Sequence, residues 1–110
     1  MEIRENEKVC IIAPICAKID QNRLKRIIAK IEKENRKIAI DLANVKDCTI
    51  NFIETIKSLK NREIGIFNIP SDIFVLFNIM NLDKYAKLYV SEIDFEEDSR
   101  QLINRKFSLV

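Results

Sequence analysis

The sequence predicts a single α/β domain over residues 1–110, with about four helices and a mostly parallel, mixed sheet of four or five strands. Three observations lead to this prediction. Short apolar runs rich in β-branched residues alternate with segments whose apolar residues recur at helical spacing, and the connections between them are short. The composition, 47% hydrophobic and 33% charged, is typical of a globular chain.

The first half of the chain begins with two predicted strands. "KVCIIAPI" (Lys8–Ile15) is an apolar run typical of a strand buried on both faces, and "EIREN" before it is expected to be its antiparallel edge partner. Asp20 is a plausible N-cap for the first helix, whose apolar positions share one face: Leu24, Ile27, Ile28 and Ile31. "KIAIDL" (Lys37–Leu42) is the next buried strand.

A second helix is predicted over residues 49–59. Its apolar side chains are expected to point into a core: Phe52, Ile53, Ile56 and Leu59. Asn51 with Glu54 three residues later has the spacing of a capping box, and Thr49 is the rival N-cap.

"EIGIFNI" (Glu63–Ile69) is a third buried strand, and the Pro70-Ser71-Asp72 run after it signals a third helix. This helix continues through "IFVLFNIM" and is apolar almost all round, so either it is enclosed in the core or it exposes a patch that a partner covers. It is expected to stop at Asn81, which tolerates a left-handed backbone.

The last predicted strand is "AKLYV" (Ala86–Val90). Ser91, followed by acidic residues, opens a final helix in which three apolar side chains share a face: Phe95, Leu102 and Ile103. Because helices join the later strands, those strands are expected to be parallel.

Several kinds of chemistry are missing from the sequence. Gly65 is the only glycine, so neither a phosphate-binding P-loop nor a GxGxxG turn can be built, and without histidine there is no Ser-His or Cys-His pair. Cys10, Cys16 and Cys48 show no CxxC spacing and are expected to be buried thiols. We therefore expect no enzyme, no cofactor and no metal, although a Lys- or Glu-based enzyme is conceivable.

The sequence also bears on location. No apolar run approaches the ~20 residues that span a bilayer, and the charged start "MEIRENEK" is unlike a signal peptide. A cytoplasmic protein without membrane insertion is expected. The net charge of +2 does not indicate a nucleic-acid partner.

Four stretches, in order, resemble the STAS domain, the family of anti-sigma-factor antagonists and of the cytoplasmic domains of sulfate transporters. "KVCIIAPICAKID" is similar to the family's second strand and its entry into the first helix, and "IAIDLANV" to its Asp-Leu-Ser-Gly-Val strand end. "MNLDKYAKLYVS" and "EIDF" resemble the end of the third helix with the next strand, and the start of the last helix. The resemblance covers nearly the whole chain.

The family's phosphorylation switch falls on the junction before the second helix. The resemblance places Thr49 at the motif's aspartate, Ile50 at the phosphoacceptor serine, Asn51 at the second serine and Phe52 at the glycine. Ile50 has no hydroxyl, so the usual switch cannot operate at the usual atom. Phosphate on Thr49 is the alternative, since a helix N-terminus favours an anion.

The sequence therefore predicts a non-enzymatic regulatory module that binds a protein through the junction: Asp47, Cys48, Thr49, Ile50, Asn51 and Phe52. The neighbouring turns at residues 17–20 and 68–71 also follow strand ends and are expected beside it. The resemblance implies a histidine-kinase-like anti-sigma factor or a transport component as the partner.

Two alternatives stay open. One is a regulatory domain that binds a small anionic metabolite or lipid head group at the start of the second helix, with Lys18 or Lys46 as counter-charge. The other is a structural subunit that self-associates through Ile73–Met80.

Overall fold

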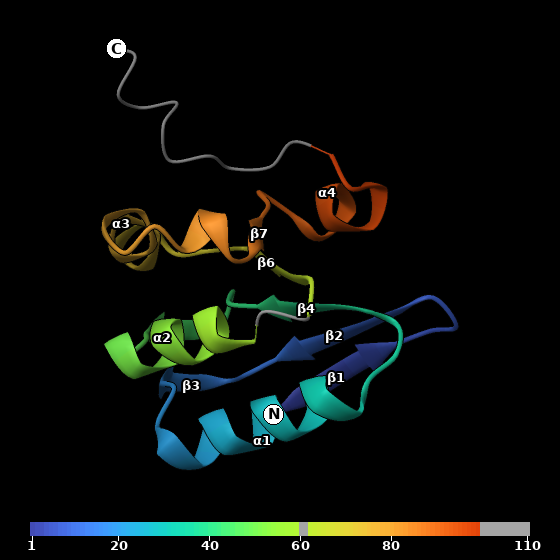
Figure 1. The fold of residues 1–110 in the computed structure, drawn as a ribbon, viewed down its shortest axis with the longest axis horizontal. Coiled ribbons are helices and arrows are strands. Elements are labelled where there is room, and N and C mark those ends of the chain that lie inside the picture. Colours follow the sequence, from blue (N-terminus) through green and yellow to red (C-terminus); the bar gives the residue numbers. More distant parts are fainter. Residues whose placement is uncertain (60–61, 100–110) are drawn as a thin grey trace.

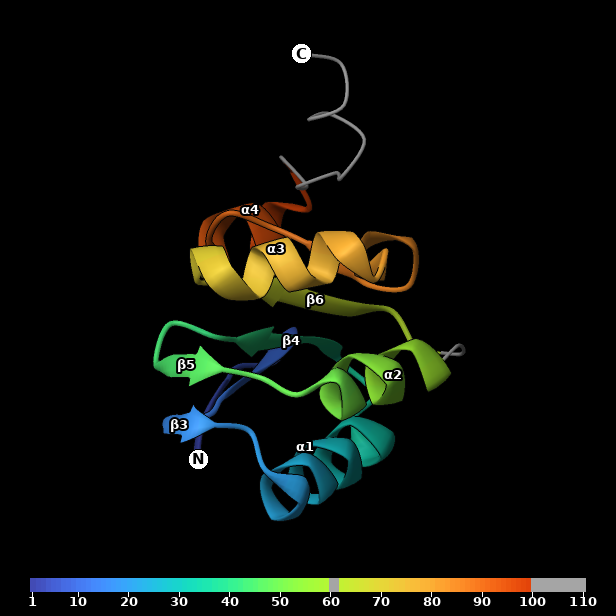
Figure 2. The same ribbon diagram turned by 90° about the vertical axis from the view of Figure 1, so that its left-hand side faces the viewer.

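The computed structural model describes residues 1–59 and 62–99. A five-stranded sheet in the order β1-β2-β4-β6-β7 forms its centre, and a smaller sheet pairs β3 with β5 (Figures 1 and 2). The strands are β1 (Glu2–Glu5), β2 (Val9–Ala13), β3 (Cys16–Lys18), β4 (Lys37–Asp41), β5 (Val45–Asp47), β6 (Ile64–Phe67) and β7 (Lys87–Leu88). The helices are α1 (Gln21–Lys33), α2 (Ile50–Ser58), α3 (Ser71–Ile79), a 3₁₀ turn η1 (Leu82–Lys84) and α4 (Glu92–Glu97).

The predicted fold class is confirmed. β1 is antiparallel to β2, as expected of the "EIREN" segment, and the other neighbouring strands of the large sheet are parallel. The register aligns Cys10 with Ile38 and Ile38 with Ile64, so apolar side chains of the same parity form rows across the sheet.

Successive side chains along each strand point to opposite faces of the sheet, so the buried residues form two clusters. One face of the sheet packs against α1, α2 and α3 and holds the larger cluster, which includes Ile12, Ile40 and Ile66. The opposite face packs against α4 in a smaller cluster, which includes Ile11, Phe67 and Phe95. Because both faces are covered, the strands read as continuous apolar runs in the sequence.

The β3–β5 pair was not anticipated. Pro14 has no amide hydrogen, so β2 ends at Ala13, and the chain then begins a new pairing in which the Cys16 amide donates to the Asn44 carbonyl at 3.2 Å. Cys16 aligns with Val45 and Lys18 with Asp47. This small sheet extends the carboxyl edge of the large one and carries the chain into α2.

The predicted helix ends are largely as observed. Thr49, not Asn51, is the N-cap of α2, so the capping-box prediction is wrong. Asn81 adopts a left-handed backbone with φ 57°, just after α3, as predicted. Leu102 and Ile103, expected on the last helix, lie outside the described residues.

Helix α3 is buried on one side and exposed on the other. Ile73 and Phe77, one turn apart, are buried in the larger cluster. Val75 and Ile79 on the opposite side are 56% and 71% exposed. Within the described ranges, no helix has the length and apolar character needed to cross a membrane.

Gly65 in β6 is required by close packing rather than by an unusual backbone angle. A Cβ atom at this position would lie 2.7 Å from Cδ1 of Phe95 and 3.3 Å from Cε2 of Tyr89. The Phe95 ring therefore occupies the space that a side chain would take. This contact fixes the distance between α4 and the sheet.

We expect Gly65→Ala to destabilise the fold by about 1–3 kcal/mol, because the methyl group overpacks this contact. The free energy of unfolding would be measured by urea denaturation. In a Phe95→Leu background the same Gly65→Ala change should lower the free energy of unfolding by less, because the aromatic ring that the methyl group meets is absent. An equal cost in both backgrounds would contradict the packing explanation.

Candidate functional site

The junction predicted from the sequence lies at the carboxyl edge of the parallel strands. Figure 2 looks onto this edge, where α3 crosses above β5 and the first turns of α1 and α2 lie below it. Open α/β sheets commonly place binding sites at this edge. The location agrees with the predicted position.

Thr49 holds the start of α2. Its side-chain oxygen accepts a hydrogen bond from the Phe52 amide at 3.1 Å, which satisfies one of the free amides of the first turn. The threonine hydroxyl is therefore part of the helix cap in this structure. Sequence analysis had offered Thr49 only as the rival cap.

Ile50 and Phe52 differ in their exposure to solvent. The Ile50 side chain is 56% exposed at the first position of α2. Phe52 is fully buried, and its ring stacks on Phe77 of α3 with centroids 6.4 Å apart. Phe52 therefore does not reach the surface through which the junction is predicted to bind a protein, and the helical periodicity that assigned it to the core is correct.

The other junction residues also divide between core and surface. Cys48 is 4% exposed, and burial raises the pKa of its thiol to about 12. Asp47 is exposed and accepts a hydrogen bond from the Cys48 amide at 2.9 Å. The exposed Asn51 donates from its side chain to Gln21 at 2.7 Å, which links the first turns of α2 and α1.

The neighbouring turns lie partly beside the junction. Lys18 in β3 is in register with Asp47, so the turn at residues 17–20 adjoins it. Lys18 and Lys46 are both exposed. The turn at residues 68–71 leads into α3, which packs beside β5.

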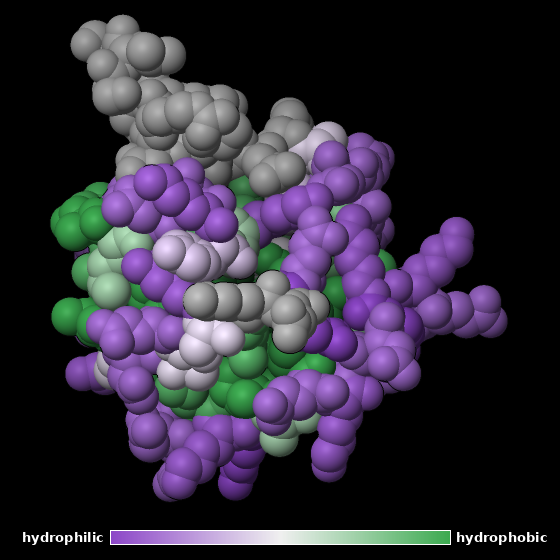
Figure 3. All heavy atoms as spheres, viewed as in Figure 1, coloured by the Kyte–Doolittle hydropathy of each residue, from purple (hydrophilic) through white to green (hydrophobic). Residues whose placement is uncertain are grey.

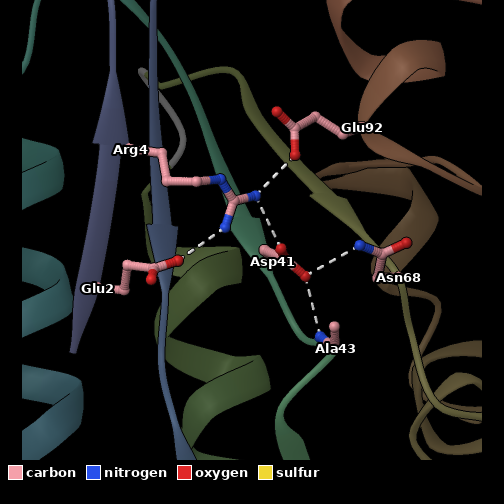
Figure 4. A network of polar contacts seen from close by, with 6 residues as sticks. All are labelled: Glu2, Arg4, Asp41, Ala43, Asn68 and Glu92. Atoms are coloured by element: carbon pink, nitrogen blue, oxygen red, sulfur yellow. Dashed lines mark hydrogen bonds and ion pairs between the residues drawn. The ribbon is translucent and has the colours of Figure 1, made fainter.

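A polar network behind this edge joins segments that are far apart in the sequence (Figure 4). Asp41, with a side chain only 8% exposed, accepts a hydrogen bond from Arg4 at 2.9 Å. Its other oxygen accepts from the Ala43 amide at 2.9 Å and from the Asn68 side chain at 3.1 Å. Arg4 also pairs with Glu92 at 2.7 Å, so one guanidinium connects β1, β4 and α4.

Several of these residues could not be predicted from the sequence. No sequence pattern marks Arg4 as part of a polar network, because it lies in a charged segment and its partners are 37 and 88 positions away. Val75 and Ile79 were included in an apolar run, but the sequence does not show which side of α3 stays exposed. Figure 3 shows hydrophobic residues gathered over α3 at one margin of the molecule.

The described part of the chain offers no metal site at the junction. No group of three or more Cys, Asp or Glu residues there could hold a metal ion. A cavity of about 440 Å³ lies elsewhere, at the amino ends of β4, β6 and β7.

Compared with known proteins, the sequence matches no family model and no curated relative.

We expect Asp41→Ala to destabilise the protein by about 2–3 kcal/mol, because it leaves the Ala43 amide and the Asn68 side chain without their acceptor. Glu2→Ala is the matched control. It removes another carboxylate from the same guanidinium, 3.1 Å away, but Glu2 is 53% exposed, so the change should stay within about 0.5 kcal/mol. Equal losses in the two variants, measured by urea denaturation, would contradict the central role of Asp41.

Proposed function

We propose that the chain is a STAS-like domain that acts as a non-enzymatic, cytoplasmic protein-interaction module and lacks the family's phosphoserine switch. The observation that carries this proposal is the exposure of Ile50 at the first position of α2. In the resemblance this is where related domains have the phosphoacceptor serine. An aliphatic group favours an apolar contact and cannot accept phosphate.

The surroundings of Ile50 support a protein partner. We use the term Ile50 surface for the exposed Ile50 side chain and the first turn of α2 around it. Val75 and Ile79 of α3 are also exposed, but they lie on the side of that helix opposite Phe77, the residue that stacks on Phe52 of α2. Burial of such side chains at an interface releases their hydration and stabilises the complex.

The proposed partner is a histidine-kinase-like anti-sigma factor or a transport component, as the resemblance implies. Self-association is the second candidate, because Val75 and Ile79 lie in the segment Ile73–Met80. Gel filtration at several concentrations separates the two, since a self-associating chain would elute earlier as its concentration rises.

The first test concerns the switch. When the protein is incubated with ATP and its captured partner, we expect no phosphate on residues 47–52, because Ile50 offers no acceptor atom. Mass spectrometry of the intact chain and of its peptides would measure this. Stoichiometric phosphothreonine at Thr49 would show that the switch survives in a shifted register.

The second test concerns the Ile50 surface. Ile50→Asp should weaken binding of the captured and purified partner by roughly 1–3 kcal/mol, since it places a charge in an apolar contact. Ile93→Asp is the matched control, because Ile93 is 63% exposed and also lies in the first turn of a helix, α4. Both variants place an aspartate where the helix dipole tolerates it, so the fold should survive.

Calorimetry would give the two affinities and circular dichroism the helix content. Equal affinities for Ile50→Asp and Ile93→Asp would overturn the proposed interface.

A further inference from the structure

A second site lies at the opposite edge of the sheet. The cavity of about 440 Å³ is bordered by residues that begin parallel strands, Lys37 of β4 and Lys87 of β7, and by Glu63, which directly precedes β6. The junction follows β5 at the carboxyl edge, so the two sites lie at opposite ends of the parallel strands. The volume falls within the range of small-molecule pockets.

Four cations line this cavity: Arg36, Lys37, Arg62 and Lys87. Two carboxylates, those of Glu63 and Asp98, line it as well. The lining thus carries an excess of positive charge, which favours an anionic ligand.

The four cations are not equally neutralised. Arg36 pairs with Glu34 and with Glu5, and Lys87 pairs with Glu63 and with Asp98. Within residues 1–59 and 62–99, neither Lys37 nor Arg62 forms a salt bridge with a carboxylate, although the charge of Lys37 helps to lower the pKa of Asp98. Both side chains thus have donors that no salt bridge occupies.

Lys37 is also held in place. Its ammonium group lies 4.6 Å from the centroid of the Phe95 ring and donates a hydrogen bond to the Phe95 carbonyl. An ammonium has three donor hydrogens, so further donors stay free for a ligand oxygen. The Phe95 ring packs against Gly65, and both residues line the cavity.

We propose that this cavity binds a small organic dianion, a phosphate monoester or a dicarboxylate, through Lys37 and Arg62. A planar guanidinium can hold two oxygens of such a group at once, and an ammonium can contact a third. The proposal goes beyond the interaction module, because the site uses residues on the other edge of the sheet.

The only glycine in the sequence makes this site easy to observe. Labelling the full chain with ¹⁵N-glycine gives one backbone amide signal, from Gly65 in the lining of the cavity. Phenyl phosphate and succinate would each be titrated at fixed pH and ionic strength, with sodium chloride as the blank. We expect a saturable shift of the Gly65 signal with at least one of the two, and the responding probe identifies the ligand class.

Variants then assign the binding groups. Lys37→Gln and Arg62→Gln should each weaken binding of the responding probe about tenfold, the loss expected for one charge-assisted hydrogen bond. Lys25→Gln is the control, because Lys25 is an exposed cation of α1 that does not line this cavity. Circular dichroism would check that each variant is folded.

Three results would overturn the proposal: a shift that does not saturate with either probe, unchanged affinity in both cavity variants, or an equal loss in Lys25→Gln. None of these bears on partner binding at Ile50, so the failure of one site can be told from the failure of the other.

Discussion

The carboxylate of Asp41 is the interaction on which the arrangement at the carboxyl edge depends. It ends the central strand β4 and is nearly buried, so it needs partners that compensate for its lost hydration. Arg4, the Ala43 amide and the Asn68 side chain supply them. These partners fix the edge strand β1, the turn after β4, and Asn68, whose left-handed backbone leads toward α3. One charge thus positions three separate segments.

Two contacts of aromatic rings, one with the backbone at Gly65 and one with another ring, hold the helices against the sheet. Phe95 fills the space above Gly65 and brings α4 against one face of the sheet. Phe52 stacks on Phe77 and brings α3 against the first turn of α2 on the other face. The first contact lies in the lining of the charged cavity, and the second packs α3 against α2, the helix that carries Ile50. The two candidate sites therefore arise from packing on opposite faces of the same sheet.

The two sites also differ in physical character. At the carboxyl edge the exposed Ile50 lies among exposed polar and charged side chains, and the Thr49 oxygen accepts the hydrogen bond that caps α2. At the amino edge four cations and two carboxylates line a cavity, and two of the cations, Lys37 and Arg62, form no salt bridge in the described chain, which is the basis of the proposed anion site. The two proposed sites do not overlap, because they lie at opposite ends of the parallel strands. Coupling between the edges would require two arrangements of the strands or helices that join them.

The sequence by itself determined the fold class, because strands buried on both faces and one-sided helices have distinct periodicities that need no knowledge of the neighbours. It also determined the antiparallel edge strand, the end of α3 before Asn81, and the absence of a phosphoacceptor hydroxyl on residue 50, which is isoleucine. Only the tertiary structure decided that Phe52 belongs to the core while Ile50 stays exposed, since both are apolar and which of them is covered depends on where α3 packs. The same reason applies to Arg4 and to the cavity at Lys37, whose partners come from distant segments that meet only when the sheet forms.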